Sequence, residues 1–194
     1  MDKKIAALWL LGATAAAHAG PFGLEMGTKL EDLKKRFKLV HDTAYGYSIS
    51  GVPQPDAHYE TYGVVVTPEH GLCKIEAISK FIDSSVDGTE LKAAFSKAEA
   101  ALRRQYGPAA HTDRLDREST LKQTRDWMKS LVKEERTLAS GWSSRFTVLP
   151  DHLYGVTLEA RAGDEQAGVL MVTYEFENFK ACAELVKAAE DASR

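Results

Sequence analysis

Three segments in the C-terminal third of the chain alternate between apolar and polar residues, and this alternation limits the possible folds more than any other feature. Phe146 and Val148 share one face of the first segment, and the other two segments cover 154–160 and 170–176. A period of two residues is typical of strands that bury one face. The link 162–168 is polar and contains glycine, as hairpin turns do. We therefore expect three consecutive antiparallel strands here.

The other predicted elements follow no regular strand-helix alternation. Two more strands are predicted at 59–67 and 72–82, joined by the turn 68–71. Four helices are predicted: a short one from the capping box of Thr28 and Glu31, a long one after Asp87 that ends at Gly107-Pro108, a charged one within 113–138, and a last one that Asn178 caps. This order predicts an α+β fold, with an antiparallel sheet of about five to six strands and helices packed mainly on one face.

The first nineteen residues have the organisation of a signal peptide. A cationic start at Lys3 and Lys4 is followed by the uncharged run 5–17 and by the small-x-small site Ala17-His18-Ala19. The run is shorter than the ~20 residues that span a bilayer, so a membrane anchor is disfavoured. We expect residues 1–19 to be removed and residues 20–194 to form a single α+β domain, periplasmic or secreted, with no transmembrane segment. No cysteine follows Ala19, so no lipid anchor is expected there.

The chain has two cysteines, Cys73 and Cys182. An exported protein meets an oxidising environment, in which cysteines form stable disulfides. A Cys73–Cys182 disulfide is therefore expected, and it would close a long loop and stabilise the fold by up to about 4–5 kcal/mol. The alternative is a pair of separate buried thiols that act as small apolar residues.

Two short motifs resemble those of known envelope proteins. Pro21-Phe22-Gly23-Leu24-Glu25-Met26-Gly27-Thr28 resembles the Gly-Met-Ser/Thr helix start of small bacterial envelope proteins, and Leu102-Arg103-Arg104-Gln105-Tyr106-Gly107-Pro108 resembles a helix end common in uncharacterised secreted or periplasmic α+β proteins. The first motif is also similar to that of the SmpA/BamE-type outer-membrane assembly lipoproteins. These are small α+β modules that bind other proteins, so the resemblance implies a binding role and carries over no catalytic residue.

Few residues have the spacing that catalysis or metal binding requires. The net charge of −3 becomes −4 once Asp2, Lys3 and Lys4 are removed, which argues against a nucleic-acid partner. No serine lies in a Gly-x-Ser-x-Gly elbow, and no pair of histidines has the close spacing of a zinc site, so no metal or cofactor is expected. The alternative of a small periplasmic hydrolase or metal-dependent enzyme requires distant histidines and carboxylates to converge, from among His58, His70, His111 and His152.

The remaining candidates are binding residues. Tyrosines are common at recognition sites because they offer a large amphipathic contact area, and four of them surround the loop 52–55: Tyr45, Tyr47, Tyr59 and Tyr62. Packing at the sheet edge is the alternative role for them. Trp127 lies off the apolar stripe of the charged helix and is expected to be exposed. The sequence thus favours a non-enzymatic periplasmic protein that binds another envelope protein or a small ligand, with an immunity or inhibitor protein as the other alternative.

Overall fold

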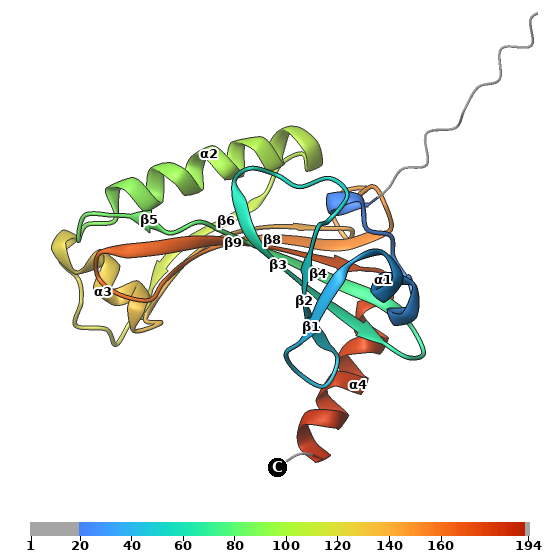
Figure 1. Ribbon diagram of the computed structural model, residues 1–194. Coiled ribbons are helices and arrows are strands. Elements are labelled where there is room, and N and C mark those ends of the chain that lie inside the picture. Colours follow the sequence, from blue (N-terminus) through green and yellow to red (C-terminus); the bar gives the residue numbers. More distant parts are fainter. Residues whose placement is uncertain (1–19, 193–194) are drawn as a thin grey trace, which may run out of the picture.

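The computed structural model describes residues 20–192, so the signal peptide predicted at residues 1–19 lies outside the described part of the chain. The described residues form one antiparallel sheet of nine strands, with four α-helices and two 3-10 helices (Figure 1). The helices are η1 (Pro21–Gly23), α1 (Leu30–Arg36), α2 (Thr89–Tyr106), η2 (Thr124–Asp126), α3 (Trp127–Val132) and α4 (Phe179–Ala192). The strands are β1 (Lys38–His41), β2 (Gly46–Ser50), β3 (Tyr59–Thr67), β4 (Gly71–Ser79), β5 (Ile82–Asp83), β6 (Ala110–Leu115), β7 (Arg136–Ser143), β8 (Leu153–Ala162) and β9 (Ala167–Phe176).

The strands follow the order β1-β2-β3-β4-β9-β8-β7-β6, and β5 adds to β9. Every pair is antiparallel, which confirms the α+β class and the antiparallel sheet. The expected count of about five to six strands was too low. The edge strands β1 and β6 escaped prediction because nearly all their side chains are exposed, so no one-sided apolar pattern marks them.

The charged segment 113–138 is not the long helix that its leucine spacing predicts. It contains the end of β6, then η2, the six-residue α3 and the start of β7. Leu138 is buried in β7, and α3 buries Met128 and Leu131. The helical spacing of these residues therefore arises from two different elements that reach the same core.

Eight of the nine strands belong to two units with the same topology, each a helix followed by four antiparallel strands, and β5 lies between the units in the chain. The first runs from α1 to β4, the second from α2 to β9, and they meet where β4 pairs with β9. Gly-Thr-x-Leu precedes or opens both helices, at Gly27 and at Gly88, and both glycines have the positive φ that favours glycine. Tyr-Gly-Val recurs in both third strands, around Gly63 in β3 and Gly155 in β8. The units therefore correspond residue by residue at several positions.

Helix α2 covers one face of the sheet and forms the main core with it (Figure 1). It buries Leu91, Phe95, Leu102 and Tyr106. Every second residue of β8 and β9 faces this layer, and the buried ones include Val156, Leu158, Val172, Tyr174 and Phe176. Each such side chain stabilises the fold by about 1.5–3 kcal/mol, so this layer fixes the sheet.

Helix α4 lies on the opposite side of the sheet from α2, against β3 and β4 (Figure 1). The expected disulfide is present, with the Cα atoms of Cys73 and Cys182 6.5 Å apart. The register of β3 and β4 shifts between Val65 and Val66, which leaves Cys73 without a partner on β3. Such a bulge re-aims a side chain, here towards α4. The helices therefore cover both faces, contrary to the expectation of one face.

None of the helices within residues 20–192 combines the length and the hydropathy that crossing a bilayer would need.

Candidate binding site on the open face of the sheet

The four predicted binding tyrosines do not form one exposed cluster. Tyr62 is 8% exposed, and its hydroxyl accepts a hydrogen bond from the backbone N–H of Asp56 at 3.0 Å. Tyr59 packs edge-on against Phe22, and burial raises the pKa of Tyr59 to about 12. Tyr45 and Tyr47 are half-buried and line a separate cavity of about 430 Å³ beside α1. These tyrosines thus pack at the sheet, which was the alternative role, and Tyr59 and Tyr62 hold the loop 53–58.

Trp127 is 5% exposed, so the expectation that it would be exposed is wrong. Its ring lies between two cations, with Lys92 Nζ 5.0 Å and Arg136 Cζ 5.6 Å from the ring centre. A Cβ added to Gly88 would come within 2.1 Å of the ring. Trp127 opens the short α3 and packs against the start of α2, so its contacts within the fold bury it.

The face of the sheet opposite α2 carries small and hydroxyl side chains across its centre. The strand registers place two glycines, two threonines and one glutamate side by side in one row across β3, β4, β9, β8 and β7: Gly63, Glu76, Thr173, Thr157 and Gly141. All five are partly exposed. We call this surface the open face, because α4, at its β3–β4 end, is the only helix within residues 20–192 that lies against it (Figure 1).

Three charged residues lie together at the centre of the open face, on β4 and β9. Lys74 Nζ is 2.8 Å from Glu76 Oε1, and it also lies 5.8 Å from the centre of the Phe179 ring of α4. Glu175 is the register partner of Lys74 on β9. Burial raises the pKa of Glu175, the charge of Lys74 opposes this shift, and the charge of Glu76 adds to it. Glu76 thus has an ion-pair partner at the centre of the open face, whereas the half-buried carboxylate of Glu175 has none within residues 20–192.

A cavity of about 570 Å³ opens beside Glu175, and we call it the Glu175 cavity. Its residues come from the start of β6, from β7, β8 and β9 and from the loop 144–152: Pro108, Ala110, Gly141, Trp142, Ser143, Phe146, Thr147, Tyr154, Gly155, Thr157 and Glu175. Gly155 is the register partner of Glu175, and a Cβ at Gly155 would contact Glu175 Oε2 at 3.7 Å. The absence of side chains at Gly141 and Gly155 thus leaves room above the sheet.

Phe146 and Tyr154 line this cavity with exposed apolar side chains, and a third exposed apolar side chain, Val148, stands two residues after Phe146 in the same loop. Among the described residues, six large hydrophobic side chains are exposed, and three of them belong to 146–154. Phe146 is 90% exposed, Val148 95% and Tyr154 38%. Large exposed apolar side chains that cluster in this way typically mark an interaction site. The alternation of Phe146 and Val148, which predicts a strand, therefore belongs to a loop that projects from the sheet.

The loop 144–152 has a defined turn. Asp151 and His152 both have left-handed backbone conformations, with φ of 58° and 60°, and Leu153 N–H donates to Pro150 O at 3.1 Å. Each non-glycine residue in this region costs about 1–2 kcal/mol, so it persists only where the surrounding contacts hold it. Two backbone hydrogen bonds do so here, from Ser144 N–H to Tyr154 O and from Glu177 N–H to His152 O, both 2.9 Å.

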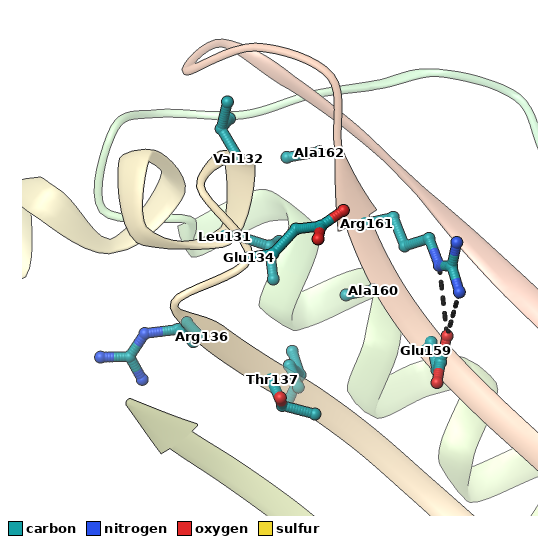
Figure 2. A pocket seen from close by; sticks show the side chains of 10 residues that line it. Leu131, Val132, Glu134, Arg136, Thr137, Glu159, Ala160, Arg161 and Ala162 are labelled. Carbon is teal, nitrogen blue, oxygen red and sulfur yellow. Dashed lines mark hydrogen bonds and ion pairs between the residues drawn. The ribbon is translucent and has the colours of Figure 1, made fainter. Parts of the chain in front are cut away.

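A second cavity, of about 320 Å³, lies where α3 meets β7 and β8 (Figure 2). Figure 2 shows Glu159 and Arg161 bonded to each other on β8, with the Arg161 Nη2–Glu159 Oε2 distance 2.9 Å. Arg136 points away from this pair and bonds to Asp113 on β6. Three of the four charged groups that line this cavity thus have partners within residues 20–192, and Glu134 is the fourth, so it is a weaker candidate site.

The histidines of the enzyme alternative do not converge. His58 contacts Asp56, His111 contacts Glu99 and His152 contacts Glu177, at 2.7, 3.2 and 3.5 Å. Within residues 20–192, no group of three or more histidine, cysteine or carboxylate side chains is arranged to hold a metal ion.

The contact of His111 with Ser140 and Glu99 is structural. Ser140 is 1% exposed, and its hydroxyl donates to Glu99 Oε1 at 2.7 Å. Burial acts to raise the pKa of Glu99, but hydrogen bonds from Ser140 and Arg103 outweigh it and keep that pKa below its usual value. A buried serine that donates to a carboxylate has no free access to a substrate. The cluster therefore joins α2 to β6 and β7.

Comparison with protein-family models, with curated proteins and with solved structures found no match to this chain. The resemblance to SmpA/BamE-type lipoproteins therefore stays a prediction.

Proposed function

We propose that this chain is a non-enzymatic binding protein, exported to the periplasm or secreted, that binds another protein of the cell envelope through the open face and the loop 144–152. The signal-peptide pattern of residues 1–19 and the Cys73–Cys182 disulfide support the compartment. The single observation that carries the binding role is the exposure of Phe146 and Tyr154 at the rim of the Glu175 cavity, with exposed Val148 in the same loop.

The exposure of the rim favours a protein over a small ligand. Small-molecule sites are concave and enclose most of the ligand. Phe146 and Val148 project from the surface instead, at 90% and 95% exposure, so a small molecule in the cavity would leave most of both side chains in water. A second protein surface buries such side chains, and aromatic anchors of this kind supply much of the binding energy at protein interfaces.

An inhibitor or immunity role is the second candidate, and the backbone of the loop favours it. The turn at Asp151 and His152 holds Phe146 on a short, hydrogen-bonded loop, and a preformed loop loses little entropy when it binds. In this case the partner is a toxin or lytic enzyme. The activity of the captured partner would then fall when the purified chain is added in equal amount.

Co-purification with matched variants tests the binding role. The exported chain carries a C-terminal tag and is recovered as wild type, as Phe146→Ala with Val148→Ala, and as Phe81→Ala. Phe81 is the control because it is 78% exposed but lies outside the Glu175 cavity, between β4 and β5. Loss of aromatic anchors commonly costs more than 2 kcal/mol of binding, so recovery of the partner should fall at least about tenfold in the double variant only. Equal recovery with all three proteins, or no reproducible partner, contradicts the proposal.

A further inference from the structure

The Glu175 cavity has the chemistry of a site for one basic side chain. Among the eleven residues that line it, Glu175 is the only charged one. The others supply apolar or aromatic surface at Trp142, Phe146 and Tyr154, hydroxyl groups at serine and threonine, and open space at glycine. A single carboxylate at the end of an apolar wall matches a side chain with an aliphatic stem and a cationic head.

The carboxylate of Glu175 has no ion pair or hydrogen bond within residues 20–192, and the comparison of the two units explains why. In the first unit, Glu76 faces Gly63 and binds Lys74, which stands two residues earlier on the same strand. In the second unit, Glu175 faces Gly155, but Thr173 stands two residues earlier. Lys74 lies opposite Glu175 and its charge opposes the rise in the pKa of Glu175, but Lys74 forms its ion pair with Glu76, so Glu175 has no ion-pair partner within residues 20–192. A half-buried carboxylate without an ion pair or a hydrogen bond is unfavourable unless a partner protein supplies a cation or a hydrogen-bond donor.

The surrounding side chains favour arginine over lysine. A guanidinium is planar, it bonds to a carboxylate through two parallel N–H groups, and it stacks on aromatic rings. Glu175 offers the carboxylate, while Phe146 and Tyr154 offer rings at the rim. An anionic ligand finds no cation among the residues that line this cavity. The negative charge of Glu175 and the aromatic rings at the rim therefore favour an arginine side chain as the occupant of the cavity.

We propose that the Glu175 cavity receives an arginine side chain of the partner protein, with the guanidinium on Glu175 and the stem against Phe146 and Tyr154. This inference rests on the proposed function, since it names the group by which the partner is recognised. Gly141 and Gly155 leave the space through which the side chain reaches the carboxylate.

Titration of the ¹⁵N-labelled chain with a small probe tests the inference without the partner. The probe is N-acetyl-Gly-Arg-Gly-amide, and the control probe carries citrulline, which has the same shape but no charge, in place of arginine. The arginine probe should shift the amide signals of Gly141, Gly155 and Glu175 in a saturable way, with a millimolar dissociation constant, because one side chain supplies little binding energy. The citrulline probe should bind at least about tenfold more weakly.

Two variants complete the test. Glu175→Gln keeps the shape of the side chain and should lose at least about tenfold in affinity for the arginine probe. Glu159→Gln, on the same face but paired with Arg161, should bind like wild type. Equal binding of the citrulline probe, unchanged binding to Glu175→Gln, or no saturable shift overturns the inference. If the arginine probe fails while Phe146→Ala with Val148→Ala still loses the partner, the binding role stands and only the arginine site is wrong.

Discussion

At the scale of single residues, Glu175 combines a cost to stability with a position at the centre of a binding surface. Burial raises its pKa in the folded chain, so the folded state holds the proton more tightly than the unfolded state does. Its contribution to stability is therefore present at acidic pH and is lost as the pH rises through the raised pKa. Groups that are kept at such a cost are often functional.

Glu175→Gln should for this reason raise the melting temperature at pH 7, because the amide removes a half-buried charge. The gain should shrink as the pH falls below the usual range of a carboxyl group, since Glu175 is then neutral in both states. Thermal unfolding from pH 3 to pH 8 measures this difference. A variant that is less stable than wild type at pH 7 and equal at pH 3 would show that the charge stabilises the fold instead.

Gly88 is the residue on which the packing of Trp127 depends. Gly88→Ala should lower the free energy of unfolding by about 2–4 kcal/mol, because φ is +74° and the new Cβ would overlap the Trp127 ring. Gly27→Ala is the matched control, since Gly27 precedes α1 as Gly88 precedes α2, has φ of +76°, and would place an added Cβ at an ordinary contact distance, 3.8 Å from His70 O. It should cost only the backbone term, about 1 kcal/mol. Urea unfolding of both variants separates the two effects, and equal losses would remove the overlap as a cause.

At the scale of elements, α4 depends on the disulfide more than any other helix does. Apart from Cys182, no residue of α4 is buried. Its first turn is held by the disulfide, by the contact of Lys74 with Phe179, and by Asn178, whose side chain donates to His70 O and Leu72 O at 3.0 Å. Few tertiary contacts remain when the disulfide is removed.

Replacement of both Cys73 and Cys182 by alanine should therefore increase amide hydrogen exchange in α4 much more than in α2. The loss in free energy of unfolding should be about 2–4 kcal/mol, within the usual range for a disulfide that closes a long loop. Hydrogen exchange followed by mass spectrometry reads the two helices separately. If α2 and α4 lose protection equally, the disulfide stabilises the fold as a whole and does not hold α4 locally.

Elements that bury one side could be predicted from the sequence, and elements that bury neither side could not. The strands β3, β4, β8 and β9 and the helix α2 bury one side, so their periodicity is visible, and the disulfide followed from export and cysteine count. The edge strands β1 and β6 bury neither side, and α3 is too short for a helical period to appear. The bulge at Cys73 depends on pairing with β3, which a local pattern does not contain.

At the scale of the whole molecule, the site could not be predicted because its residues come together only when β6, β7, β8 and β9 pair and the loop 144–152 folds beside them. The pairing of β4 with β9 then places Lys74 and Glu76 beside Glu175, far apart in the chain. Phe146 and Val148 were assigned to a buried strand face, since alternation alone does not distinguish a strand from a projecting loop. One signal was present: Tyr-Gly-Val occurs twice, and both glycines face the glutamates at the centre of the open face.

The two sides of the sheet differ in what covers them. Helix α2 and the core residues behind it hold one side, so the open face and the loop 144–152 remain for contact. We therefore expect the open-face side of the molecule to bind the partner and the α2 side not to bind it.

Site-specific photo-crosslinking of the exported chain distinguishes the two sides of the sheet. A photoreactive phenylalanine analogue is placed at Phe146 or Thr157 on the binding side, and at Lys97 or Ala100 on the exposed surface of α2. We predict that Phe146 and Thr157 give an adduct with the same partner protein and that Lys97 and Ala100 give none. The same adduct from α2, or adducts from α2 alone, would contradict this expectation.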